Sequence, residues 1–133
     1  MEVPPPIREA MVAHARFCFP EEACGLLAAD QDGRLRMAYC LTNIEHSPTT
    51  FTLDPTEHFR ALKHAERLDW HLAGVFHSHT HTAPYPSPRD VALANEPHWL
   101  YLIVGLADWA EPSLGGYWIR EGKVLEEPLV VTR

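Results

Sequence analysis

Short apolar runs and stretches of alternating apolar and polar residues divide most of the chain into predicted strands. A short apolar run bounded by turn residues is typical of a strand buried in a sheet. The predicted strands lie at residues 23–29, 35–41, 50–53, 72–76, 99–106, 114–119 and 124–131. The first two flank the turn at residues 30–33 and the last two flank Glu121-Gly122, so each pair is expected to form a hairpin.

Three helices are predicted, one before the first of these strands and two between later ones. Apolar residues at helical spacing predict a helix over residues 7–17, which Pro20 ends. The other two start with the same signal, a capping residue followed by proline and, three places after the cap, an acidic residue. They are expected over residues 54–68 and 87–95. Helices interleaved with strands and hairpins favour an α/β or α+β fold, with a single mixed β-sheet flanked by helices.

Composition narrows the class of protein. The chain has 133 residues, 46% hydrophobic and 22% charged, as expected for one globular domain over residues 1–133. Eleven basic and eighteen acidic residues give a formal net charge of −7, which disfavours nucleic acid as a partner. The chain lacks both a long apolar run and a signal-peptide pattern, so we expect no membrane association and a cytoplasmic location. Cys18, Cys24 and Cys40 include no CxxC pair and are expected to be buried, reduced thiols.

Candidate metal ligands follow the predicted strand at residues 72–76. His77 and His79 lie two residues apart, so in an extended chain both imidazoles face the same side. Asp90 falls in the first turn of the next predicted helix. Two histidines and one carboxylate leave a fourth position open to water, which is typical of a catalytic zinc site.

Each of these residues also has a structural explanation. Histidine on a strand is often only partly buried, and helix capping alone accounts for Ser87 and Asp90.

Other metal families with an HxH pair do not match. The metallo-β-lactamase pattern requires Asp where this chain has His81 and His where it has Thr82, while the zinc-deaminase and HExxH patterns are absent. A cupin pattern needs an acidic residue soon after the pair, and none occurs before Asp90. The combination nevertheless favours metal binding.

The complete spacing resembles that of the JAMM (MPN+) metalloprotease family. His77-x-His79 is followed by seven residues, Ser87, two residues and Asp90, as in the family motif. Upstream, residues 20–27 (PEEACGLL) resemble the strand of the family that carries its glutamate, and residues 51–57 resemble the segment before its middle helix. The resemblance extends over nearly the whole chain and implies a sheet layered with helices as in cytidine deaminases. Thr80 departs from the proline that the family commonly has after the second histidine.

The resemblance also implies a role for each residue. His77, His79 and Asp90 would bind zinc, and Glu22 would be the general base, since the family's glutamate lies three residues before the glycine that is Gly25 here. Glu21 is the alternative base. Ser87 would stabilise the oxyanion, or would serve mainly as a helix cap. The role of His81 stays open between a substrate contact, a group supporting the ligands and a solvated loop residue.

Short stand-alone members of this family act on proteins with a ubiquitin-like fold, including sulfur carriers. The resemblance therefore implies a zinc-dependent peptidase or isopeptidase that hydrolyses the bond after a C-terminal Gly-Gly. We expect residues 80–86 and 44–50 to form the walls of the site. A non-catalytic MPN scaffold and a zinc hydrolase of small-molecule amides are the alternatives, although a scaffold would be expected to lack one of the ligands. The sequence gives no indication of the oligomeric state.

Overall fold

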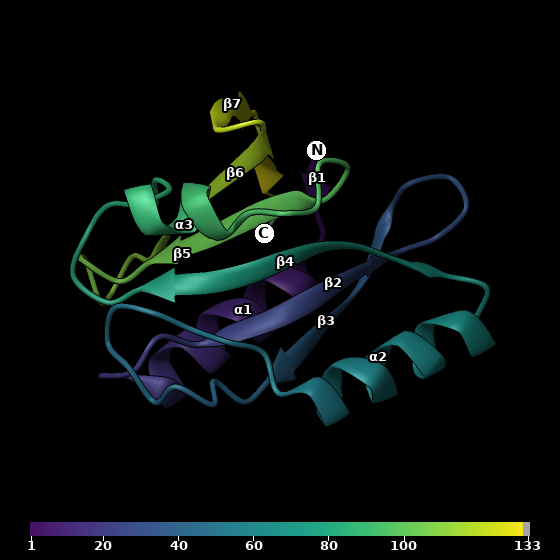
Figure 1. Cartoon of the computed structure of the whole chain (residues 1–133), viewed down its shortest axis with the longest axis horizontal. Coiled ribbons are helices and arrows are strands. Elements are labelled where there is room, and N and C mark those ends of the chain that lie inside the picture. The colour runs from purple at the N-terminus through teal and green to yellow at the C-terminus, as the bar shows by residue number, and fades with distance from the viewer. Residues whose placement is uncertain (132–133) are drawn as a thin grey trace.

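Six strands form one mixed sheet in the computed structural model, which describes residues 1–131 (Figure 1). The strands follow the spatial order β3-β2-β4-β5-β6-β7. Their bounds are β2 (Cys24–Ala29), β3 (Leu35–Leu41), β4 (His71–His79), β5 (Leu100–Gly105), β6 (Ser113–Arg120) and β7 (Lys123–Glu127). Within this sheet β4 and β5 run parallel, and the other neighbours are antiparallel. The predicted mixed sheet and both predicted hairpins are therefore confirmed.

Helices cover both faces of the sheet. In Figure 1, α1 (Pro5–Cys18) lies behind the sheet, while α2 (Pro55–Arg67) and α3 (Pro88–Leu93) lie in front of it. Neighbouring residues of β4 pack against helices on opposite faces of the sheet, because side chains alternate along a strand. Phe76 packs with the apolar residues of α1, whereas Val75 packs with Ala61 of α2. This layering confirms the predicted fold class.

Several element boundaries differ from those predicted. Proline is tolerated in the first turn of a helix, so α1 begins at Pro5 instead of residue 7. The predicted strand at residues 50–53 is wrong, since it forms only an isolated bridge between Leu53 and Asn43. Pro128 interrupts the predicted strand at residues 124–131, because proline cannot donate to the ladder. The chain resumes as β8 (Val130–Val131), which pairs with β1 (Glu2–Val3) in a small parallel sheet.

The centre of the sheet is positioned by close backbone packing. Gly25 on β2 pairs with Phe76 on β4, and a Cβ atom at this position would collide with the Phe76 ring and the Tyr39 carbonyl oxygen. Only glycine fits there without displacing its neighbours. The start of β2 and the end of β4 are thereby brought side by side. Among the described helices, none is long and apolar enough to cross a membrane.

Candidate metal centre and active site

The two histidines of the HxH pair lie at the end of β4, on the face of the sheet that carries α3. Both are buried, with 3% of His77 and 5% of His79 exposed. The ring of His77 stacks on Phe51, with 4.6 Å between centroids and 23° between planes. Nδ1 of His79 lies 2.9 Å from the carbonyl oxygen of Ala83. Each ring is therefore held by its own neighbour, and both Nε2 atoms face each other across 3.2 Å.

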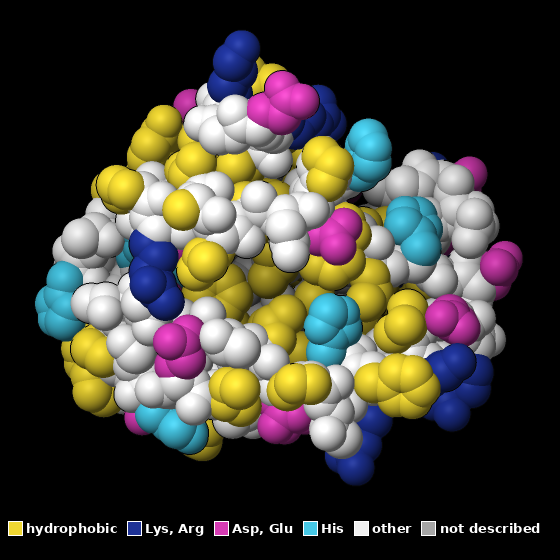
Figure 2. All heavy atoms as spheres, viewed as in Figure 1, with side chains coloured by type: hydrophobic (Ala, Val, Ile, Leu, Met, Phe, Trp, Pro, Cys, Tyr) yellow, Lys and Arg dark blue, Asp and Glu magenta, His cyan; other side chains and the backbone are white. Residues whose placement is uncertain are grey.

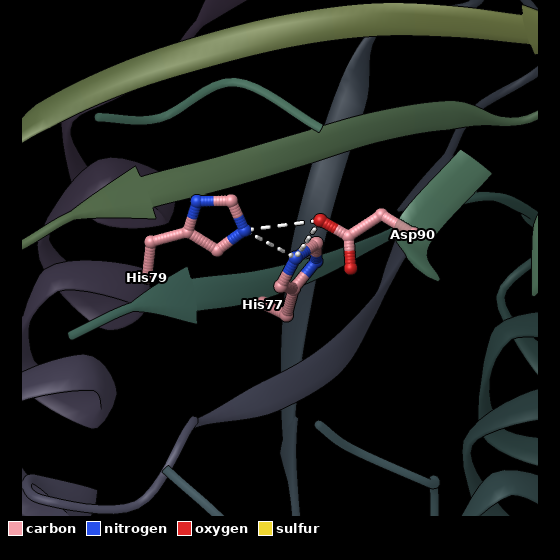
Figure 3. A group of neighbouring side chains, drawn as sticks. All are labelled: His77, His79 and Asp90. Carbon is pink, nitrogen blue, oxygen red and sulfur yellow. Dashed lines mark hydrogen bonds and ion pairs between the residues drawn. The ribbon is translucent and has the colours of Figure 1, made fainter. Parts of the chain in front are cut away.

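Asp90 completes the group from the first turn of α3 (Figure 3). Its Oδ2 lies 3.2 Å from Nε2 of His77 and 3.0 Å from Nε2 of His79. The same oxygen accepts a hydrogen bond from the backbone N–H of Ser87 at 2.9 Å. The structure thus brings together the three predicted ligands, whose ligand atoms all lie within 4.8 Å of one another.

The chemistry of this donor set fits a divalent metal ion. Nδ1 of His79 faces a carbonyl oxygen, which can only accept, so the ring proton belongs on that nitrogen. Nε2 of His79 then presents a lone pair to the same point as Oδ2 of Asp90 and Nε2 of His77. Three acceptor atoms converging in a buried position repel one another unless a proton or a cation lies among them. A metal ion would satisfy all three.

The ionisation of the group is set by burial and by mutual hydrogen bonding. In the metal-free chain, burial alone would raise the pKa of Asp90, but hydrogen bonds from ring N–H groups of His77 and His79 outweigh it and hold that pKa well below its usual range. Burial lowers the pKa of His77. Burial also opposes charge on His79, yet its hydrogen bonds to Asp90 and Ala83 raise its pKa. An ionised Asp90 and a neutral His77 are the forms that metal binding requires.

Glu22 precedes β2 and lies close to these ligands. It is 4% exposed, and its Oε1 has no hydrogen-bond partner among the described residues. Its backbone is fixed on both sides, since its N–H donates to the Ser47 carbonyl at 2.8 Å and its carbonyl accepts from Nδ2 of Asn43 at 3.0 Å. Burial raises the pKa of Glu22 to about 7, with His79 lowering and Asp90 raising it. The carboxyl group can therefore gain or lose a proton near neutral pH.

Glu21, the alternative base, faces elsewhere. Its Oε1 lies 3.1 Å from Nδ1 of His46, and 41% of its side chain is exposed. Successive residues of an extended chain point to opposite sides, which separates Glu21 from Glu22. The predicted base and its alternative thus occupy different environments, and it is Glu22 whose pKa is influenced by His79 and Asp90.

Ser87 acts as the N-cap of α3. Its Oγ accepts a hydrogen bond from the N–H of Asp90 at 3.1 Å, which completes a reciprocal capping box with that residue. The predicted cap is confirmed, and α3 ends at Leu93 instead of residue 95. The hydroxyl proton of Ser87 takes no part in these two bonds.

Some residues around the site were not identified from the sequence. Asn43 is buried and supports the loop beside the site, because its Nδ2 donates to the carbonyls of Glu22 and Thr50. Phe51 orients His77 by stacking. A single asparagine in a polar stretch gives no signal of such a role. The stacking of Phe51 depends on long-range packing that no periodicity records.

The cysteines differ in part from expectation. Cys18, Cys24 and Cys40 are free thiols as predicted, but only Cys24 is fully buried and Cys40 is exposed. Cys40 lies on the edge strand β3, and its Sγ is 3.8 Å from the carbonyl oxygen of Ala10 on α1. Nε2 of His14 on α1 lies 3.2 Å from the carbonyl oxygen of Cys24 and 2.9 Å from that of Leu41. It joins α1 to the ends of β2 and β3.

Fold and site together define a JAB-domain protein. Residues 4–116 match the family described as prokaryotic homologs of the JAB domain, and the chain belongs to this family. The predicted resemblance is thereby confirmed. The chain is a metallopeptidase of the JAMM class, as the peptidases among its relatives also indicate.

Individual relatives cover most of the chain. It is 42% identical over 123 residues to a CysO-cysteine peptidase of Mycobacterium tuberculosis, covering 92% of this chain and 84% of that protein. It is 34% identical over 102 residues to a desampylase of Haloferax volcanii, covering 72% and 73%.

A solved structure of a Desulfitobacterium hafniense protein superposes with a TM-score of 0.89 at 37% identity, covering 99% of this chain and 93% of that one. A JAB1/MPN domain protein of Archaeoglobus fulgidus, at 21% identity, superposes with a TM-score of 0.67 over the whole of both chains and supports the fold alone.

Proposed function

We propose that this protein is a zinc-dependent peptidase that hydrolyses the bond after the C-terminal Gly-Gly of a ubiquitin-like sulfur carrier protein. The observation that carries the proposal is the buried group of His77, His79 and Asp90. The buried Glu22 interacts electrostatically with two of these residues, and its Oε1 has no hydrogen-bond partner among the described residues. The names of relatives support the substrate class, since they include a CysO-cysteine peptidase and a probable TtuB-protein conjugate cleaving protease. Residues 1–133 would act as one catalytic domain.

Zinc is the metal that this donor set fits best. Two imidazole nitrogens and one carboxylate oxygen are ligands typical of catalytic zinc sites. His77 Nε2, His79 Nε2 and Asp90 Oδ2 would hold it. Zinc bound there would supply Lewis-acid chemistry, activating a water molecule and polarising the scissile carbonyl group. Phe51 and Ala83 would keep the two rings in the binding orientation.

Glu22 would move the proton. A general base takes a proton from the attacking water and then, as an acid, gives it to the leaving amine. Its Oε1 has no hydrogen-bond partner in the described part of the chain, so no protein group competes for that proton. A pKa near 7 suits both directions of transfer at neutral pH.

Ser87 would stabilise the charge that develops on the carbonyl oxygen. Its Oγ accepts from the Asp90 N–H, which leaves the hydroxyl proton to be donated to an oxyanion. The same residue holds Asp90 through its own N–H. Ser87 would therefore combine a catalytic contact with the positioning of a ligand.

The substrate tail would approach over the face of the sheet that carries α2 and α3. Figure 2 shows hydrophobic side chains at the bottom of the hollow between these helices. Glycine has no Cβ, so a Gly-Gly tail can bring its backbone close to a buried metal centre. The free thiols fit a reducing compartment, and we place the activity in the cytoplasm.

Mass spectrometry of carrier fusions tests the proposal. A folded sulfur carrier ending in Gly-Gly and extended by further residues should be cut after the second glycine. The same carrier with Ala-Ala in place of Gly-Gly should show a sharply lower kcat/KM. An unfolded peptide ending in Gly-Gly should also be a poor substrate, because it lacks the contacts of the folded body. Equally efficient cleavage of generic unfolded peptides would overturn the carrier proposal.

A further inference from the structure

Exposed aromatic side chains gather at the end of the sheet beside the candidate active site. Phe19 and Trp109 are 38% and 47% exposed, and His81 is also exposed. The Phe19 ring lies 5.2 Å from that of Trp109 and 5.7 Å from that of His81, between centroids. We call these three residues the aromatic surface. Figure 2 shows hydrophobic side chains next to a histidine at the left end of the molecule, where β4 ends in Figure 1.

The aromatic surface is held in place by specific contacts. Its members come from three separate segments, those that follow α1, β4 and β5. Arg16 at the end of α1 donates from Nη2 to the carbonyl oxygen of Trp109 at 2.8 Å. Its guanidinium group also lies over the Trp109 ring, 5.9 Å from the centroid. Exposing aromatic rings to water is unfavourable and adds nothing to the hydrophobic core. An exposed aromatic cluster that is nevertheless held in place is typical of a recognition surface.

The position of the aromatic surface favours contact with the residues that follow the scissile bond. Phe19 lies three residues before Glu22, and His81 lies two residues after His79. Trp109 follows β5, the strand beside β4. If Glu22 gives its proton to the leaving amine, that amine lies within hydrogen-bond reach of Glu22. A polypeptide joined to that amine and continuing past the strand ends would meet the aromatic surface.

We propose that the aromatic surface binds the first residues of the polypeptide that leaves, and that it prefers apolar side chains in them. The inference rests on the proposed function and extends it to the part of the substrate after the scissile bond. Burying apolar side chains against Phe19 and Trp109 would contribute to binding in the transition state. A leaving group of a single amino acid offers one side chain at most, whereas a polypeptide can cover the whole surface.

Three substrates that share one folded carrier and its Gly-Gly tail test this inference. The first carries one amino acid after Gly-Gly, the second a short peptide with apolar residues in its second and third positions, and the third the same peptide with serine there. Cleavage by the intact protein should be faster for the apolar peptide than for the other two, by about tenfold in kcat/KM. In Trp109→Ala and Phe19→Ala, the ratio of kcat/KM between apolar and serine peptides should fall towards one.

Phe59→Ala provides the matched control. Phe59 is an exposed aromatic residue, 58% exposed on α2 and close to Lys63, outside the aromatic surface. Its replacement should leave the ratio between apolar and serine peptides as in the intact protein. The ratio of kcat/KM between the two peptides is unaffected by partial misfolding, because inactive molecules lower both rates equally. Melting temperatures measured on the same samples show any loss of stability.

The outcomes separate this inference from the proposed function. Cleavage of all three substrates at equal rates, with no change in Trp109→Ala, would overturn the inference and leave the carrier peptidase intact. A preference for apolar residues that persists in both variants would also overturn it. Failure to cut any of the three carriers would instead contradict the proposed function.

Discussion

Ser87 and Asp90 hold each other through two hydrogen bonds that run in opposite directions. The Asp90 N–H donates to Oγ of Ser87 at 3.1 Å, and the Ser87 N–H donates to Oδ2 of Asp90 at 2.9 Å. That Oδ2 is also the oxygen that faces His77 and His79. The cap of a short helix and the carboxylate of the candidate metal centre are therefore one structural unit. Changes at Ser87 should affect both stability and catalysis.

Ser87→Ala should lower both stability and kcat. Loss of the cap should reduce the free energy of unfolding by about 1 kcal/mol. Loss of an oxyanion contact should lower kcat about 10²-fold with a smaller effect on KM, because the contact forms mainly in the transition state. Melting temperature and steady-state kinetics on the same samples separate the two effects. An unchanged kcat per folded molecule would show that Ser87 serves only as a helix cap.

Asp54→Ala is the matched control for capping. Asp54 caps α2 by accepting hydrogen bonds from the backbone N–H groups of Thr56 and Glu57, much as Ser87 caps α3. Its replacement should lower the melting temperature to a similar extent, with kcat retained. A comparable drop in kcat would show that loss of stability alone accounts for the Ser87→Ala result.

Glu22→Gln should abolish turnover while keeping the metal. The amide has the size of the carboxyl group but cannot accept the proton of the attacking water, and loss of a general base lowers kcat by about 10²–10⁴. Glu21→Gln is the control, since Glu21 pairs with His46 on the other side of the chain. Metal content and kcat should be measured for both. An active Glu22→Gln beside an inactive Glu21→Gln would show that the base is Glu21.

The buried carboxyl group of Glu22 should make the metal-free protein less stable as pH rises. Its pKa is raised from 4.5 to about 7, so the folded state binds this proton more tightly than the unfolded chain does. The stabilisation is fully present below the unfolded pKa of 4.5 and is lost as pH rises through about 7. Glu22→Gln lacks this titration. Urea unfolding of the chelator-treated protein should show the variant gaining stability relative to the intact chain between about pH 5 and about pH 8. A difference that does not vary with pH would contradict the raised pKa.

Local patterns in the sequence predict much of the fold and part of the geometry of the candidate metal centre. The capping signals at Asp54 and Ser87 identify the starts of α2 and α3, because capping depends on residues within one turn. The two-residue spacing of His77 and His79 puts both rings on one face of a strand. The approach of Asp90 to these rings required the family resemblance, since it depends on how α3 packs on the sheet.

Features that depend on contacts between distant segments were missed or misplaced. The short pairing of β1 with β8 joins residues from the two ends of the described chain and has no local signal. Asn43 and Phe51 act through the loop that packs against Glu22 and His77. An apolar pattern at residues 50–53 suggested a strand, but a strand needs a partner with unpaired backbone groups, and only Asn43 bridges there, at Leu53.

Zinc content and peptidase activity measured on the same samples test the central claim most directly. The account predicts about one zinc per chain in the intact protein, loss of activity on chelation and its return with about one equivalent of zinc. Asp90→Ala should bind zinc poorly and stay inactive, because the carboxylate that faces both histidines is gone. Full activity of the metal-free protein on a Gly-Gly carrier fusion, or equal zinc content in Asp90→Ala and the intact chain, would contradict it.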